Sequence, residues 1–142
     1  MSQDRPYSTA TESRFSSADL LVAAEVVALV AIGGFAGSNL RYFAGLVVPG
    51  LAGTLLVNVL GSTTLGFVLY ERIYGGVLAD ETRLLVGTGF LSSLTTYSSF
   101  AVQTAQAAPA LMVANVVANY ALGFVGVLVG RSLARRFDGG ER

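Results

Sequence analysis

Charged residues in this chain separate long stretches that are almost entirely apolar. Glu25 and Arg41 enclose 15 uncharged residues, Arg41 and Glu71 enclose 29, and residues 84–130 contain no charge at all. About 20 mainly apolar residues are enough for a helix to cross the hydrocarbon core of a bilayer. The pattern therefore predicts an all-α membrane protein with four transmembrane helices, near residues 21–43, 51–70, 84–103 and 110–131.

The segments outside these helices are short. Residues 1–18 are polar and rich in Ser and Thr, and they lack the basic region and short apolar core of a signal peptide. We expect a mobile polar tail there. A single four-helix transmembrane domain is expected over residues 19–136, with a C-terminal tail at residues 137–142.

Composition supports a membrane protein and excludes several classes of function. The chain is 53% hydrophobic and its mean hydropathy is +0.62, which is too apolar for a soluble domain of this length. The absence of Cys and His removes disulfides, thiol nucleophiles and imidazole chemistry. A formal net charge of zero provides no basic field for nucleic acid. We therefore expect neither an enzyme nor a nucleic-acid-binding protein.

The distribution of arginines predicts how the chain sits in the bilayer. With four spans, both termini and the loop at residues 71–83 lie on one side, which carries eight arginines, whereas the other side has only Arg41. Basic residues are enriched in cytoplasmic segments. We therefore expect a multi-pass protein of the cell membrane with cytoplasmic termini.

Small and polar residues recur within the predicted spans. Gly33 and Gly37 form a small-xxx-small pair, which lets another helix approach closely. Asn58 follows Thr54 by one turn, and an amide in mid-span is costly without partners. Packing and an ion path are both open interpretations of Asn58. The six Ser and Thr residues within residues 92–99 favour a path for something polar, because one span rarely needs so many hydroxyls to pack.

Three ordered segments resemble signature sequences of the CrcB/Fluc fluoride channels. Residues 33–42, 53–62 and 89–100 are similar to the signatures of the first, second and third helices of that family, and chain length and span number agree. The resemblance implies a fluoride-specific channel for passive export from the cytoplasm. It also implies an antiparallel dimer of four-helix subunits, with a structural sodium ion at the dimer centre.

The resemblance assigns roles to individual residues. Arg41 matches an arginine that ends the first helix, and we assign it a structural role with Gly33 and Gly37. Ser92 and Thr95 match positions whose backbone carbonyls bind sodium at a break in the third helix. Amide and hydroxyl donors and the positive edges of aromatic rings suit an anion such as fluoride. The fluoride pore is expected at Thr54, Asn58, Tyr97, Phe100, Ser99 and Asn119.

Two features help to predict whether this chain pairs with a copy of itself or with a related subunit. One is a set of two departures from the family pattern, and the other is the asymmetric charge. Ser92-Ser93 stands where the family usually has two glycines, and Tyr97 replaces a phenylalanine. An antiparallel homodimer needs balanced basic charge on its two sides. We therefore predict half of an antiparallel heterodimer with a related subunit of opposite charge bias, with a homodimer as the alternative.

Two other functions stay open at this stage. Glu25 lies about one turn into the first predicted span, and it could serve a proton-coupled exporter of small molecules. A carboxylate near a helix N-terminus is also stabilised by the helix dipole alone. The chain could, finally, be a non-conducting subunit that only pairs with a partner in the bilayer.

Overall fold

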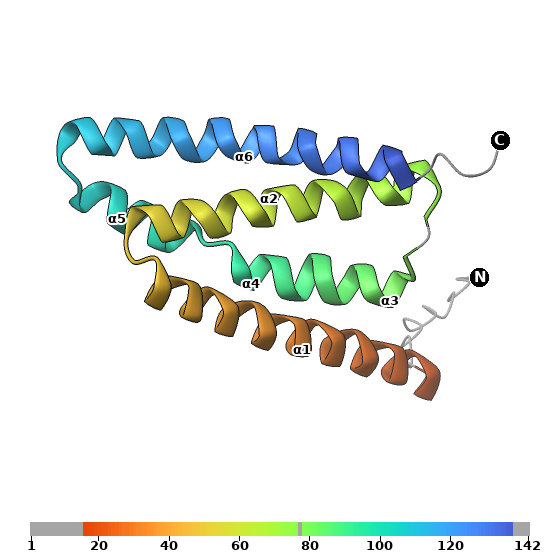
Figure 1. The fold of residues 1–142 in the computed structure, drawn as a ribbon. Coiled ribbons are helices and arrows are strands. Elements are labelled where there is room, and N and C mark those ends of the chain that lie inside the picture. The colour runs from red at the N-terminus through yellow and green to blue at the C-terminus, as the bar shows by residue number, and fades with distance from the viewer. Residues whose placement is uncertain (1–15, 77, 138–142) are drawn as a thin grey trace, which may run out of the picture.

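The computed structural model of the chain describes residues 16–76 and 78–137. Most of the predicted tails, residues 1–15 and 138–142, lie outside the described residues. The described part is helical (Figure 1). Its elements are α1 (Ser17–Val47), α2 (Leu51–Tyr74), α3 (Asp80–Arg83), the π-helical segment η1 (Leu84–Leu91), α4 (Ser92–Leu94), α5 (Tyr97–Gln106) and α6 (Pro109–Phe137).

Helix α1 begins at Ser17, inside the segment predicted as a tail. Ser16 caps it in a reciprocal arrangement: its side chain accepts from the Ala18 amide, and its own amide donates to the Asp19 carboxylate at 2.9 Å. Such a capping box satisfies amides that the first helical turn leaves unpaired. The cap explains why the helix extends beyond the apolar run on which the predicted boundary rested.

Three helices are long and apolar enough to cross a membrane: α1, α2 and residues 109–136 of α6. The fourth segment, residues 80–106, consists of shorter pieces, so none of them reaches that length. Figure 1 shows these four segments side by side, with α2 between α6 and the segmented helix, and α1 beyond it. The arrangement is the all-helical bundle that the hydropathy pattern predicts.

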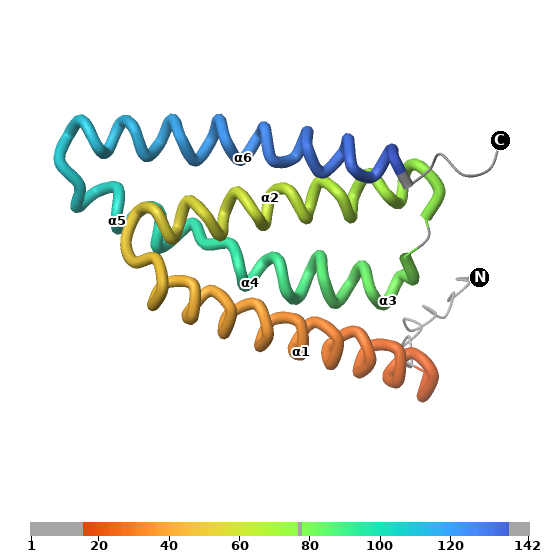
Figure 2. Tube along the Cα trace, viewed as in Figure 1, coloured from red at the N-terminus to blue at the C-terminus, as the bar shows by residue number. Residues whose placement is uncertain are grey.

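The segmented helix is interrupted at Thr95 and Thr96. Residues 80–94 form one helical run, in which η1 is π-helical. Thr95 (φ −73°, ψ 152°) and Thr96 (φ −146°, ψ 121°) are extended, and α5 then begins at Tyr97. Figure 2 shows the chain stepping sideways between α4 and α5. Ser92 is therefore helical, and the extended residues are Thr95 and Thr96.

Glycines bring α1 against the segmented helix. A Cβ atom on Gly33 would overlap the carbonyl oxygen of Leu85, and one on Gly37 would overlap the carbonyl oxygen of Phe90. Both obstacles are backbone atoms of η1, which cannot turn away as a side chain would. Gly89 on η1 faces Gly33 in the same contact. Close approach of two backbones through small residues is the usual packing of membrane helices.

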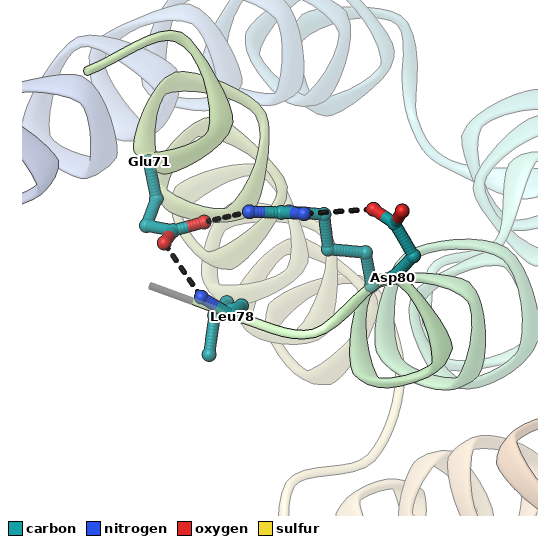
Figure 3. A network of polar contacts seen from close by, with 4 residues as sticks. Glu71, Leu78 and Asp80 are labelled. Carbon is teal, nitrogen blue, oxygen red and sulfur yellow. Dashed lines mark hydrogen bonds and ion pairs between the residues drawn. The ribbon is translucent and has the colours of Figure 1, made fainter. Parts of the chain in front are cut away.

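A buried ion pair ties the loop after α2 to the segmented helix (Figure 3). The Glu71 carboxylate, 5% exposed, accepts from the Leu78 amide at 2.8 Å and from Arg83 Nη2 at 3.0 Å. Arg83 Nη1 also donates to Asp80 at 2.8 Å. The hydrogen bond to Glu71 is the main cause that raises the pKa of Arg83. A buried charge is tolerated because it is paired and hydrogen-bonded.

Candidate functional site at the helix break

Asn58, on α2, bonds to both backbone groups of Thr96. Its Oδ1 accepts from the Thr96 amide at 2.9 Å, and its Nδ2 donates to the Thr96 carbonyl at 3.3 Å. In a continuous helix the Thr96 amide would donate to the carbonyl of Ser92, four residues earlier. The side chain of Asn58 therefore takes over backbone hydrogen bonding where the helix is interrupted, which offsets the cost of a half-buried amide.

A line of amide and hydroxyl groups continues from Asn58 onto α6. Asn58 Nδ2 donates to Asn119 Oδ1 at 3.2 Å, and Asn119 Nδ2 donates to the carbonyl and Oδ1 of Asn115, both at 3.0 Å. Asn115 Nδ2 donates to Thr104 Oγ1 at 2.7 Å. Thr104 in turn donates to the Phe100 carbonyl at 2.5 Å. Three helical segments thus meet in one uncharged polar network.

The hydroxyls at the start of α5 gather around Thr96. Its Oγ1 accepts from the Ser99 amide at 3.2 Å, which caps the N-terminus of α5. The same oxygen lies 3.3 Å from Ser98 Oγ and donates to Ser99 Oγ at 3.2 Å. A hydroxyl can donate and accept. These three side chains can therefore exchange hydrogen bonds among themselves and with an ion.

The Ser92 and Thr95 hydroxyls donate to backbone carbonyls three or four residues earlier in the chain. Ser92 Oγ donates to the carbonyls of Thr88 and Gly89, and Thr95 Oγ1 donates to the Leu91 carbonyl at 2.9 Å. Side chains that bond in this way satisfy backbone carbonyls locally. The Ser92 and Thr95 hydroxyl protons are therefore used within the same helical turn.

Three aromatic rings lie beside the network. The centroids of Tyr97 and Phe100 are 5.8 Å apart, with planes tilted by 47°. The Phe100 and Tyr120 centroids are 6.3 Å apart in an edge-to-face pair. Phe100 is 8% exposed, whereas Tyr97 is 74% exposed. The ring edges carry partial positive charge, so Phe100 combines an apolar wall with a weak electrostatic attraction for an anion.

Two cavities meet at Thr96. The first, of about 420 Å³, is lined by polar residues of the break and by the three aromatic rings, and it includes Asn58, Asn119, Ser92 and Thr95. The second, of about 300 Å³, lies toward the start of α2 and is lined by Arg41, Thr54, Ser99 and Gln103, among others. Thr96 is the residue that the two linings share.

The family of this chain follows from its comparison with known proteins. A family model described as CrcB-like protein, Camphor Resistance (CrcB), matches residues 28–131. The chain belongs to the CrcB family. That membership confirms the resemblance found in the three ordered segments, and with the apolar helices it makes the chain a multi-pass membrane protein.

Curated relatives match most of the chain. The protein named fluoride-specific ion channel FluC 1 from Haloarcula marismortui is 62% identical over 120 residues, which are 84% of this chain and 94% of that protein. FluC 2 from Halobacterium salinarum is 49% identical over 124 residues, covering 87% and 97%. FluC 1 from Natronomonas pharaonis is 54% identical over 113 residues, covering 77% and 93%. These names describe channels, which confirms the expectation that this CrcB chain is not an enzyme.

The residues predicted for the pore, the sodium site and structural roles differ in which of the two cavities they line. Asn58, Asn119, Tyr97, Phe100, Ser92 and Thr95 line the first cavity, and Thr54, Ser99 and Arg41 line the second. Gly33 and Gly37 are not part of either lining and instead contact η1. Glu25 is exposed and lines a separate cavity with Asp80 and Glu81, so it does not join the polar network.

Sequence reasoning missed some members of the site. Gln103, on α5, accepts a hydrogen bond from Thr54 Oγ1 at 2.8 Å, although the sequence predicted no role for it. Thr104 lies in the network through its bond to Asn115, and Tyr120 contributes the third ring. One signal could have found Tyr120, because it directly follows Asn119. The contact between Thr54 and Gln103 joins positions 49 residues apart and leaves no local pattern.

Proposed function

We propose that this chain is a subunit of a fluoride-specific channel that lets fluoride leave the cytoplasm passively. The observation that carries the proposal is the uncharged polar network centred on Asn58, which joins two cavities at the helix break. Membership of the CrcB family and the printed names of its relatives support fluoride as the ion.

The chemistry of the route suits a small, strongly hydrated anion. Amides and hydroxyls can replace part of the hydration shell, and ring edges can face the ion without a fixed charge. A charged donor in the narrow part would hold the ion, whereas conduction needs binding that is weak enough for release. The first cavity is lined by uncharged residues, and Arg41 stands only beside the second, where it can attract anions to the entrance.

The test is an efflux assay with the purified protein in liposomes. We expect fluoride to leave loaded vesicles rapidly, and chloride under the same conditions to stay inside. Equal efflux of the two ions would contradict selectivity for fluoride. Fluoride efflux that requires a proton gradient and is lost in Glu25→Gln would support an exporter instead of a passive channel.

We propose further that the backbone carbonyls of Ser92 and Thr95 hold a structural sodium ion. In a continuous helix these carbonyls would accept from the amides of Thr96 and Ser99. Those amides donate instead to Asn58 Oδ1 and to Thr96 Oγ1. Carbonyl oxygens are hard ligands of the kind that alkali cations prefer, and irregular backbone at membrane depth is tolerated where it is buried in protein.

Sodium dependence of the flux tests this site. We expect fluoride efflux to be lost when sodium is removed during reconstitution and replaced by a large organic cation, and to return when sodium is added back. Replacement by potassium at the same ionic strength controls for a general effect of salt. Undiminished efflux from sodium-free protein would contradict a structural role for the ion.

An antiparallel dimer accounts for the polar groups that one subunit leaves uncovered. Ser92 and Ser98 are exposed in the middle of the bundle, and Tyr97 is exposed on the open side of the first cavity. Hydroxyls at that depth do not belong against lipid. A second subunit over this face would cover them and close the cavity into a pore.

From the charge bias we propose that the second subunit is a related chain of opposite bias, and that the termini lie in the cytoplasm. Among the described residues, the end that holds the starts of α1 and α3 and the ends of α2 and α6 carries five arginines, and the other end carries Arg41 (Figure 1). Expressed alone with a topology reporter on its C-terminus, the chain should insert in one orientation. Equal amounts of both orientations, with fluoride resistance from this chain alone, would support a homodimer.

Tyr97 should serve the pore through its ring. We expect Tyr97→Phe to conduct fluoride at least as well as the unchanged protein, because the ring edge is kept. Tyr97→Ile should conduct much less, because the ring quadrupole is lost while the apolar bulk stays similar. Both rates are measured by fluoride efflux from liposomes. Equal rates for the isoleucine variant and the unchanged protein would exclude the ring from the ion route.

A further inference from the structure

Two arginines and two tyrosines form a cluster where α2 and α6 end. The rings of Tyr70 and Tyr74 are stacked, with centroids 6.0 Å apart and planes inclined by 23°. The Arg131 guanidinium carbon lies 5.0 Å from the Tyr70 centroid, and that of Arg135 lies 5.3 Å from the Tyr74 centroid. Cation–π contacts of this kind hold each guanidinium against a ring. We call these four residues the arginine–tyrosine cluster.

The Tyr74 hydroxyl fixes both guanidiniums and keeps a donor of its own. It accepts from Arg131 Nε at 3.3 Å and from Arg135 Nε at 2.8 Å. A phenolic oxygen that accepts twice still has one proton to donate. Each guanidinium uses its Nε in this way and keeps its terminal amino groups. The cluster therefore presents two preorganised forks of donors and one hydroxyl.

The positive charge of the cluster is not neutralised within residues 16–76 and 78–137. The ion pairs found there are those of Arg83 with Glu71 and Asp80, on the neighbouring loop. Neither Arg131 nor Arg135 pairs with a carboxylate in the described part of the chain. Arg135 is exposed and Arg131 is partly exposed, so an anion from outside can reach both.

The cluster also lies at the ends of two predicted spans, where we expect the headgroups of a bilayer. Both arginines belong to the last two turns of α6, and both tyrosines to the last two turns of α2, at the same end of the bundle (Figure 1). Tyrosines are enriched at this level of membrane proteins, and basic residues there attract anionic lipids. The most abundant anion at that depth is the phosphate of a lipid headgroup.

We propose that the arginine–tyrosine cluster binds the phosphate group of an anionic phospholipid. The planar forks of Arg131 and Arg135 match pairs of phosphate oxygens, which a single-atom anion could not engage in this way. The Tyr74 hydroxyl supplies a further donor. This site is separate from the helix break, and the proposal does not depend on which ion the channel conducts.

The experiment measures lipid binding to the purified full-length protein in detergent, at about 0.1 M salt because higher ionic strength screens surface charge. The probes are phosphatidylglycerol, phosphatidylcholine and inorganic phosphate, and bound lipid is counted by native mass spectrometry. We expect phosphatidylglycerol to bind in preference to phosphatidylcholine. The double variant Arg131→Gln/Arg135→Gln should bind it roughly thirtyfold more weakly, as expected when two interfacial arginines are removed.

Arg136→Gln is the matched control for the single variant Arg135→Gln, because each removes one charge from the same turn of α6, and no contact of Arg136 with either tyrosine is found among the described residues. It should keep phosphatidylglycerol binding within about twofold of the unchanged protein, less than the loss expected for a basic residue that contacts the lipid. If the double variant does not fold, Tyr74→Phe provides the test, since it keeps both charges and the ring but should still weaken binding severalfold. Equal loss in the control and cluster variants would overturn the proposal, as would binding of inorganic phosphate without a preference for the anionic lipid.

Discussion

Asn58→Asp should abolish fluoride efflux and leave the chain folded. The carboxylate can still accept from the Thr96 amide, but it has no donor for the Thr96 carbonyl or for Asn119. It also places a negative charge in the wall of an anion route. At 4 Å and an effective dielectric constant of 20 this repulsion is about 4 kcal/mol, or roughly a thousandfold in occupancy.

The measurement is fluoride efflux from liposomes, with size-exclusion chromatography to establish that the variant is folded. Asn39→Asp makes the same chemical change on α1, where the amide donates only to the Phe35 carbonyl of its own helix and takes no part in the network. The control should conduct within about threefold of the unchanged protein, because Asn39 lines neither cavity of the proposed route. Near-normal fluoride flux through folded Asn58→Asp protein would refute the role of Asn58 in the route.

Gly37→Ala should destabilise the protein strongly, although alanine is the better helix former. The new methyl group would overlap the backbone carbonyl of Phe90, so α1 must move away from η1. Overpacking of this kind costs about 1–3 kcal/mol, or more where backbone has to shift. The loss should appear as a lower midpoint of thermal unfolding in detergent.

Gly45→Ala supplies the comparison on the same helix. A Cβ atom at Gly45 would have no atom within 4 Å. There alanine should leave stability unchanged or raise it by about 0.5–1 kcal/mol, the difference in helix propensity. Similar midpoints for the two variants would mean that α1 does not pack on η1 through Gly37.

The number and positions of the helices could be predicted because each transmembrane helix needs about 20 consecutive apolar residues. Residues 84–130 contain no charge, and only two spans fit that length. Asn58 could be selected for a similar reason, since an amide within an apolar run needs partners. The sequence did not identify those partners, because Thr96 lies 38 residues away on another element.

The position of the interruption shows a different limit. Ser92 and Thr95 are as suitable as Thr96 for ending a helix when residue types alone are considered. The structure places the extended residues at Thr95 and Thr96. There the Thr96 amide, which is not paired within the helix, donates to Asn58, and the Thr96 hydroxyl caps α5. The contact with α2 selects one of several local possibilities, and it is not encoded within the segment itself.

Glu71 and Arg83 illustrate the same limit at the surface. In the sequence they belong to a short polar loop, and such charges are usually solvated. In the structure the carboxylate is 5% exposed and paired, so the loop is a fixed connection between α2 and the segmented helix. Only the arrangement of the neighbouring helices reveals which loop charges are buried.

The shared position of Thr96 has a consequence for the rate of transport. On the proposed route an ion passes through the two cavities one after the other, and it passes Thr96 between them. The slower of the successive steps then limits the rate of transport. Changes at Arg41 or Tyr120 would then alter how often ions are captured, whereas changes that move the Thr96 backbone would set the maximum current.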